Sequence, residues 1–150
     1  MFMKKLEIAV VQLDRAIELF LNEKDYICCI TLAGAAEEIF GKYLTHNGKK
    51  SFSDDAPYKI RECFDVEDND SKIRNDHLNF VKNELKHFNV PDREQINVYW
   101  EGQAFMMLSR AVINYVNITD EESSLINRFH QWTLNNSERI KETAQQSDIS

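Results

Sequence analysis

The chain has 150 residues, of which 43% are hydrophobic and 29% charged, and its formal net charge is -7. This length fits one domain, residues 1–150, with its own hydrophobic core, and the composition excludes a disordered chain. The acidic balance does not suit an extended surface for duplex DNA, which needs basic residues to replace counterions. Only four glycines and two prolines are present. An all-β fold needs many turns, which these residues favour, so the sequence predicts an all-α fold.

The three cysteines, Cys28, Cys29 and Cys63, do not have the spacing of a disulfide framework or a zinc site. We interpret them as reduced thiols in the core of a cytoplasmic protein. The first residues lack the apolar core of a signal peptide, and no stretch has the length of a membrane span. No membrane partner is therefore expected.

Apolar residues at helical spacing predict a series of helices joined by short connections. In chain order, these helices cover about residues 3–22, 24–46, a short piece around 58–64, then 70–88, 92–117 and 120–142. Thr119 followed by Glu122 is a capping-box pattern that predicts the start of the last helix, and residues 143–150 predict a frayed polar tail. Short connections between long amphipathic helices predict an antiparallel, up-down bundle of four to six helices.

The second predicted helix carries an acidic residue on its apolar stripe. The stripe consists of Tyr26, Ile30, Ala33, Glu37, Phe40 and Leu44. A carboxylate on a buried face needs a partner. We therefore expect a lysine, arginine or histidine from another helix to pair with Glu37.

The predicted helix over 70–88 has a polar face opposite its apolar one. On a helical wheel, the side facing the core holds Leu78, Val81, Leu85 and Phe88. The opposite arc holds Asn79, Lys82, Asn83, Lys86 and His87. We expect this arc to point away from the core, toward solvent, a ligand or another chain. His87 falls in the last turn, where the helix dipole favours imidazolium, and the two lysines suit an anion such as phosphate.

The stretch Lys82-Asn83-x-x-x-His87 resembles the Arg-Asn-x-x-x-His form of the signature of HEPN domains. These are small helical bundles found in toxin–antitoxin, CRISPR-associated and abortive-infection systems. The acidic stretch around Glu37-Glu38 in the second helix looks like a helix of the AbiV-like branch of that superfamily. The resemblance covers about residues 5–117.

The resemblance implies a homodimer that brings two copies of the motif into one groove and cleaves RNA without metal or cofactor. Carried over, His87 is the acid/base group, Lys82 replaces the arginine that steadies the phosphate, and Asn83 orients groups beside it. The further binding residues are Lys86, Asn79 and Glu37. Because lysine lacks the planar fork of arginine, we interpret the chain as an RNA- or nucleotide-binding protein with a degenerate or weak ribonuclease site, in phage defence or a stress response.

Two other interpretations remain open. Glu84-x-x-His87 has the i, i+3 spacing of di-iron bundles, although the chain has one copy of the motif where such sites use two. A non-enzymatic interaction bundle is the second. Its interface would use aromatic anchors that otherwise close the core, namely Trp100, Phe105, Phe129 and Trp132.

Overall fold

The computed structural model describes residues 1–64, 67–87 and 94–147, apart from the side chains of residues 62–64 and 77. Within these ranges all regular structure is helical and no strand occurs, which confirms the predicted all-α class. The α-helices are Lys5–Glu18 (α1), Tyr26–His46 (α2), Phe52–Phe64 (α3), Asp70–Ile73 (α4), Phe80–Glu84 (α5), Trp100–Thr119 (α6) and Ser124–Ser147 (α7), and π-helical turns cover Leu19–Glu23 (η1) and Arg74–Leu78 (η2). None of these described helices is both long enough and apolar enough to cross a lipid bilayer.

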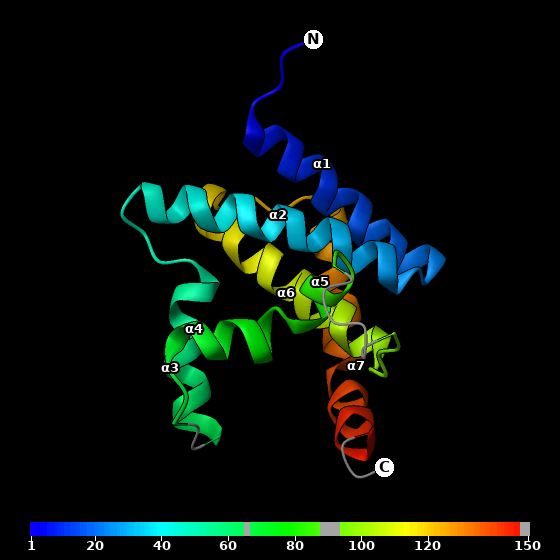
Figure 1. Ribbon diagram of the computed structural model, residues 1–150. Helices are drawn as coiled ribbons and strands as arrows, with labels where there is room; N and C mark the ends of the chain where they lie inside the picture. The colour runs from blue at the N-terminus through cyan, green and yellow to red at the C-terminus, as the bar shows by residue number, and fades with distance from the viewer. Residues whose placement is uncertain (65–66, 88–93, 148–150) are drawn as a thin grey trace.

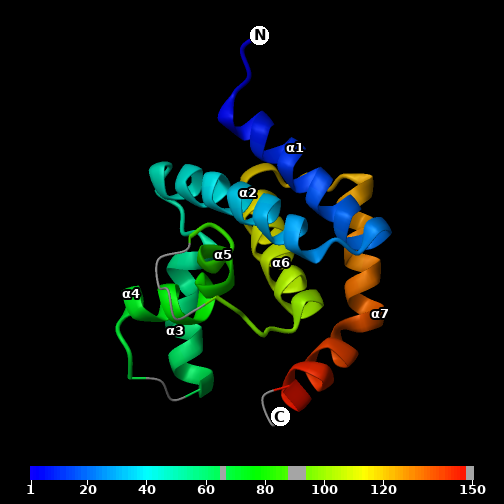
Figure 2. The ribbon, with the colours of Figure 1, turned by 45° about the vertical axis from the view of Figure 1, so that its right-hand side comes forward.

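The helix α2 is the centre of the fold. It packs against α1 on one side and α6 on the other, as Figure 1 and Figure 2 show. Its buried residues are Cys29, Ile30, Ala33, Gly34, Ala36, Glu37, Phe40, Gly41 and Leu44. A helix that is buried on several sides is apolar around most of its surface, and the many small residues of α2 let both neighbours approach closely.

The order of helix directions differs from the predicted up-down bundle. Lys24 adopts a left-handed conformation, with φ 54°, and reverses the chain between α1 and α2. The helices α2 and α6, in contrast, run in the same direction: Gly34 faces Met107, and Gly41 faces Asn114 further along both helices. The segment from α3 to α5 carries the chain back across the molecule before α6 begins (Figure 1). The antiparallel prediction therefore holds for α1 and α2 and is wrong for α2 and α6.

Aromatic rings complete the core between α1, α6 and α7. Phe20 meets the ring of Trp132 edge to face, with centroids 4.6 Å apart, and Phe105 lies 5.8 Å from the same indole. Phe129 is buried, and Trp100 is half-buried against the core. Of the four aromatics that the sequence left as either interface anchors or core residues, Phe129 lies in the core and the other three pack against it, partly exposed.

Several predicted helix boundaries are wrong. Thr119 ends α6 instead of capping the next helix, whose start is capped by Ser123, with its Oγ accepting a hydrogen bond from the Ile126 amide at 3.2 Å. The last helix continues through the predicted tail as far as Ser147. Residues 94–99 are not helical, so the helix predicted over 92–117 begins at Trp100.

The two adjacent cysteines have different environments. Cys29 is fully buried, as predicted, and burial raises the pKa of its thiol. Cys28 is exposed, which contradicts its prediction as a core residue. Neighbouring positions on a helix point about 100° apart, so the one that enters the core turns the other outward. The side chain of Cys63 lies outside the described residues, as does Phe88.

Candidate functional site

The segment predicted as one helix over 70–88 consists of three short pieces. The helix α4 ends at Ile73, the wider π-helical turn η2 follows, and Asn79, at φ -112° and ψ 0°, interrupts the helix before α5 begins at Phe80. A π-helical turn inserts an extra residue into the helix. The phase of the helix therefore changes inside the segment, and a single helical wheel does not describe it.

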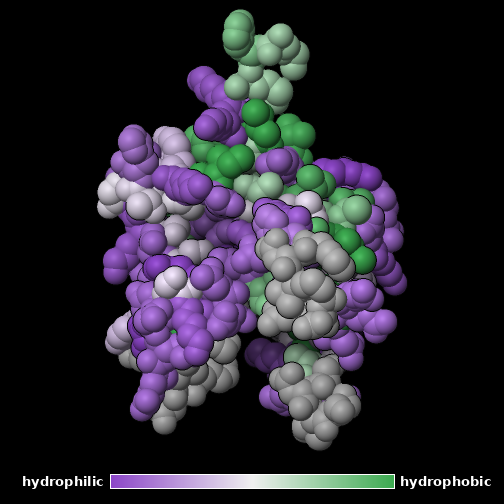
Figure 3. Space-filling view, in the orientation of Figure 1, coloured by the Kyte–Doolittle hydropathy of each residue, from purple (hydrophilic) through white to green (hydrophobic). Residues whose placement is uncertain are grey.

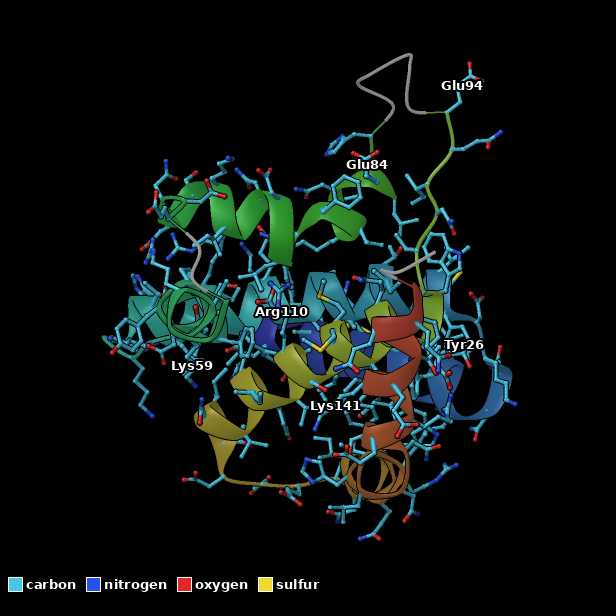
Figure 4. All side chains as sticks on the ribbon, turned by 90° about the horizontal axis from the view of Figure 1, so that it is seen from below. Tyr26, Lys59, Glu84, Glu94, Arg110 and Lys141 are labelled. Atoms are coloured by element: carbon cyan, nitrogen blue, oxygen red, sulfur yellow. The ribbon has the colours of Figure 1, made fainter. Side chains whose placement is uncertain are left out.

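Arg110, from α6, holds this interruption in place. Its Nη1 donates to the carbonyl oxygen of Leu78 at 2.6 Å, and its Nη2 donates to Oδ1 of Asn79 at 3.0 Å. The same Nη2 lies 3.1 Å from Oε1 of Glu37 and 3.2 Å from Oγ of Ser53. Arg110 is 2% exposed and lies in the middle of the molecule in Figure 4. We call Arg110, Glu37, Ser53 and Asn79 the Arg110 network.

The carboxylate of Glu37 has the cationic partners that its position on the apolar stripe required. It is 3% exposed and pairs with Arg110, which confirms the expected partner from another helix. The hydroxyl of Ser53 donates a second hydrogen bond to Oε1 of Glu37, at 2.9 Å. A buried carboxylate that keeps both a cation and a hydroxyl avoids most of the free-energy penalty of leaving water.

Lys82 is buried, which contradicts its predicted place on a face away from the core. Its side chain is 8% exposed, and its Nζ lies 3.8 Å from Oε2 of Glu37 and 3.9 Å from Oε2 of Glu38. The aliphatic stem crosses α2 at Gly34, where a methyl group would lie 2.6 Å from Cδ of Lys82. Burial lowers the pKa of Lys82, and the charge of Glu37 acts in the opposite direction. Gly34 thus gives Lys82 the space to pass over α2.

A cleft of about 710 Å³ opens beside the Arg110 network, between α2, the start of α3, η2 and α5. All the site residues predicted from the sequence line this polar cleft: Glu37, Asn79, Lys82, Asn83, Lys86 and His87. His87 follows the end of α5 and is exposed, so it does not occupy the last helical turn that the sequence predicted. The fold brings these residues together although the helix expected to carry most of them is interrupted.

The polar cleft also contains residues that the sequence did not single out. His46, the last residue of α2, is exposed and lines the cleft. Arg74 donates through Nε to the carbonyl oxygen of Ser53 at 2.9 Å, and its Nη2 lies 3.9 Å from Oδ1 of Asp54. The backbone amide of Ser51 holds the pKa of Asp54 below its ordinary value. Nothing in the local sequence around position 74 indicates this placement.

Arg110 is the main residue that the sequence analysis missed, and a signal for it was present. It lies between Leu108 and Ala111 on the apolar side of α6, where an arginine needs a buried anion. Glu37 on the stripe of α2 needed a buried cation. Because each of the two residues needs a buried partner of opposite charge, the sequence could have predicted their ion pair.

The polar cleft is locally cationic although the chain is acidic. The basic lining residues are Lys42, Arg74, Lys82 and Lys86, and the acidic ones are Glu37, Glu38 and Asp54. Arg110, behind the wall, pairs with Glu37 in addition. Two histidines, His46 and His87, add positive charge whenever they are protonated. The electrostatics therefore favour an anionic ligand.

The metal-site interpretation finds no matching geometry in the part of the chain that is described. The helix α5 ends at Glu84, so Glu84 and His87 do not share a helical face. Among the described residues, no three side chains of histidine, cysteine, aspartate or glutamate are grouped to hold a metal ion.

Comparison of the chain with models of known protein families, with curated proteins and with solved structures finds no match.

Proposed function

We propose that this protein is a HEPN-like, homodimeric domain that binds RNA through its phosphates in the polar cleft, with a weak metal-independent ribonuclease activity, in phage defence or a stress response. The single observation that supports this proposal best is the placement of the Lys82 ammonium. It lies in the wall of a cationic cleft in a chain whose net charge is -7.

A buried ammonium is an unusual group to keep for stability alone. Burial lowers the pKa of Lys82, so the protein spends folding energy to hold a positive charge there. Groups with shifted pKa values gather at functional sites for this reason. A phosphate that enters the cleft would replace part of the hydration that Lys82 loses on folding, and the exposed Lys86 would neutralise further charge.

Cleavage would follow from the same groups. The 2′-hydroxyl oxygen attacks phosphorus, a bond from phosphorus to O2′ forms, and the bond to O5′ breaks. His87 takes the proton from the hydroxyl and then gives it to the leaving O5′ oxygen, and Lys82 and Lys86 offset charge on the phosphorane. The ammonium of Lys82 is already shared with Glu37 and Glu38, so less of its charge reaches the phosphate. We therefore expect RNA binding to be the main activity and RNA cleavage to be slow.

The proposal is tested with a fluorescent single-stranded RNA, by anisotropy for binding and gel analysis for cleavage. We expect binding that weakens as salt rises, slow cleavage that His87→Ala abolishes while binding stays within a few-fold, and faster cleavage in Lys82→Arg because of the guanidinium fork. His130→Ala, on α7 and outside the cleft, is the matched control. No cleavage in the wild type and none gained by Lys82→Arg would favour a binding or scaffold role, and absence of RNA binding at low salt would refute the proposal.

The homodimer is tested separately by sedimentation. A two-fold dimer is expected, with His87 and Lys82 of both chains facing one groove. A monomer that still cleaves RNA with a requirement for His87 would contradict the shared groove while leaving the role of His87 intact.

A further inference from the structure

A second groove, of about 690 Å³, lies between α1 and α2 next to the polar cleft. Its apolar lining consists of Leu6, Ala35, Ile39 and Tyr43. Tyr43 is 42% exposed, so its ring is available to a ligand. In Figure 3 apolar surface lies over the N-terminal half of α1 and the adjoining edge of α2, and again at the right-hand end of these helices, whereas the coloured surface at the lower left is largely hydrophilic. We call this second depression the apolar groove.

The apolar groove and the polar cleft share one wall. The residues that line both are Glu38, Lys42, His46 and Lys86. Within this wall Lys42 donates to Oε1 of Glu38 at 2.9 Å. Tyr43 and His46 are three residues apart on α2 and so lie on the same side of that helix. A ligand held in the cleft can therefore extend past His46 to the ring of Tyr43.

We propose that the apolar groove is a base-binding subsite, in which a nucleotide unit of the RNA places its base against Tyr43 and Ile39 while its phosphate lies in the polar cleft. This inference rests on the proposed function and names the part of the RNA that the second groove takes. Aromatic side chains bind bases by stacking, which tolerates any base sequence.

The chemistry of the rim distinguishes a nucleotide from other apolar ligands. Besides the shared wall, Lys5 from α1 lines the groove, so three lysines surround an apolar floor. A nucleotide has a matching division, with a flat apolar base attached to an anionic phosphate. An uncharged apolar peptide would offer no negative charge to this lysine-rich rim, in which Glu38 is paired with Lys42. The two volumes, side by side, exceed what a lone phosphate needs.

The test compares ligands that differ only in the base. Calorimetric titrations use inorganic phosphate, ribose 5-phosphate and adenosine 5′-monophosphate, with the wild type, Tyr43→Ala and Tyr43→Phe. We expect the wild type to bind the nucleotide about 5- to 100-fold more tightly than ribose 5-phosphate, in line with one stacked base. Tyr43→Ala should remove that preference and leave ribose 5-phosphate affinity unchanged, while Tyr43→Phe retains the preference. Tyr58→Ala, an exposed tyrosine on α3, is the matched control and should behave as wild type.

Three other results would each overturn the base-binding subsite or the proposed function. Equal affinity of the wild type for nucleotide and ribose 5-phosphate would overturn the subsite while leaving the phosphate cleft and the proposed function in place. A Tyr43→Ala variant that keeps the preference but dissociates a dimer would assign the groove to contact between two copies and overturn the subsite. Failure of phosphate, both phosphorylated ligands and RNA to bind would overturn the proposed function as well.

Discussion

Arg110 and Arg139 each join distant parts of the chain through a carboxylate, but under opposite conditions of solvent exposure. Arg110 has a side chain that is 3% exposed and lies 3.1 Å from Glu37. Arg139, on α7, is 49% exposed and makes two hydrogen bonds to Glu101, of 2.9 and 3.0 Å. The exposed pair has the better, bidentate geometry, yet water and salt screen it. We therefore expect burial, more than hydrogen-bond geometry, to determine how much each arginine contributes to the free energy of unfolding.

The two regions also differ in what they position. Around Arg139, the ring of Tyr99 covers Gly102, and the Tyr99 hydroxyl donates to Glu101 at 2.8 Å, so the cluster fixes the start of α6 against α7. The Arg110 network instead fixes the helix interruption at Asn79. The helix α5, which lines the polar cleft, begins at the next residue. Substitutions around Arg139 should affect only the contact between α6 and α7. Substitutions in the Arg110 network should also change the shape of the polar cleft.

Arg110→Leu should have the largest effect. It leaves the Glu37 carboxylate buried without its main cation, and the loss of one partner of a buried pair lowers the free energy of unfolding by about 3–5 kcal/mol. Arg139→Leu, the matched control, should lower it by less than about 1 kcal/mol because that pair is exposed. Urea denaturation measures both variants. Equal effects of the two substitutions would contradict the importance assigned to burial.

Ser53→Ala should have an intermediate effect. The Ser53 hydroxyl donates to Glu37 at 2.9 Å and accepts from Arg110 at 3.2 Å, so its removal leaves two buried charged groups each short of one hydrogen bond. We expect a loss of about 1–2 kcal/mol in the free energy of unfolding. Ser109→Ala is the control, since the Ser109 hydroxyl donates to the Phe105 carbonyl of its own helix, and it should stay within about 0.5 kcal/mol. A similar loss for both serines would show that the network is not coupled.

The same contrast explains which parts of the structure the sequence could predict. The long helices follow from apolar periodicity, which is local, and the need of Glu37 for a cation follows from the place of a carboxylate on an apolar stripe. Five of the predicted cleft residues lie in the one short segment 79–87, and the fold places this segment beside Glu37 on α2. None of these inferences requires knowledge of distant contacts.

The interruption at Asn79 and the burial of Lys82 could not be predicted in this way. The interruption is held by hydrogen bonds from Arg110, which comes from another helix. The path of Lys82 depends on the absence of a side chain at Gly34, on a third helix. A helical wheel assumes an uninterrupted helix with one buried side, and tertiary contacts overrule both assumptions here.

Lys82→Met tests a buried cation whose desolvation its carboxylate neighbours, at 3.8 and 3.9 Å, compensate poorly. Methionine keeps an apolar stem of similar shape, and Glu37 retains Arg110. We expect the free energy of unfolding at neutral pH to stay equal or to rise by about 1 kcal/mol, while RNA binding falls. Loss of stability comparable to that of Arg110→Leu would contradict this assignment.

The pH dependence of this comparison has a definite sign. The pKa of Lys82 is lower in the folded protein than its ordinary value of 10.5. Between the two values the unfolded chain binds more protons, so the wild type gains stability as pH rises through this window. The advantage of Lys82→Met should therefore shrink between pH 7 and alkaline pH. An advantage that grows with pH would mean that the ammonium is stabilised in the fold.

Gly34→Ala should have the smallest effect on stability. Alanine favours the helix by about 1 kcal/mol over glycine, but its methyl group must displace the Lys82 stem, so we expect the free energy of unfolding to change by less than about 1 kcal/mol. The displaced ammonium should weaken RNA binding. In the Lys82→Ala background the two stem carbons that meet this methyl group are gone, and Gly34→Ala should become stabilising, with a coupling energy of at least about 0.5 kcal/mol.

Gly48→Ala provides the control for that cycle. Gly48 has φ +72° and no neighbouring atom within 4 Å of an added methyl group, so alanine there is strained by about 1–2 kcal/mol whichever residue occupies position 82. Its effect should be additive with Lys82→Ala. Additivity of Gly34→Ala with Lys82→Ala would contradict the contact between these residues. The ammonium would then reach the polar cleft by a route that does not cross α2 at Gly34.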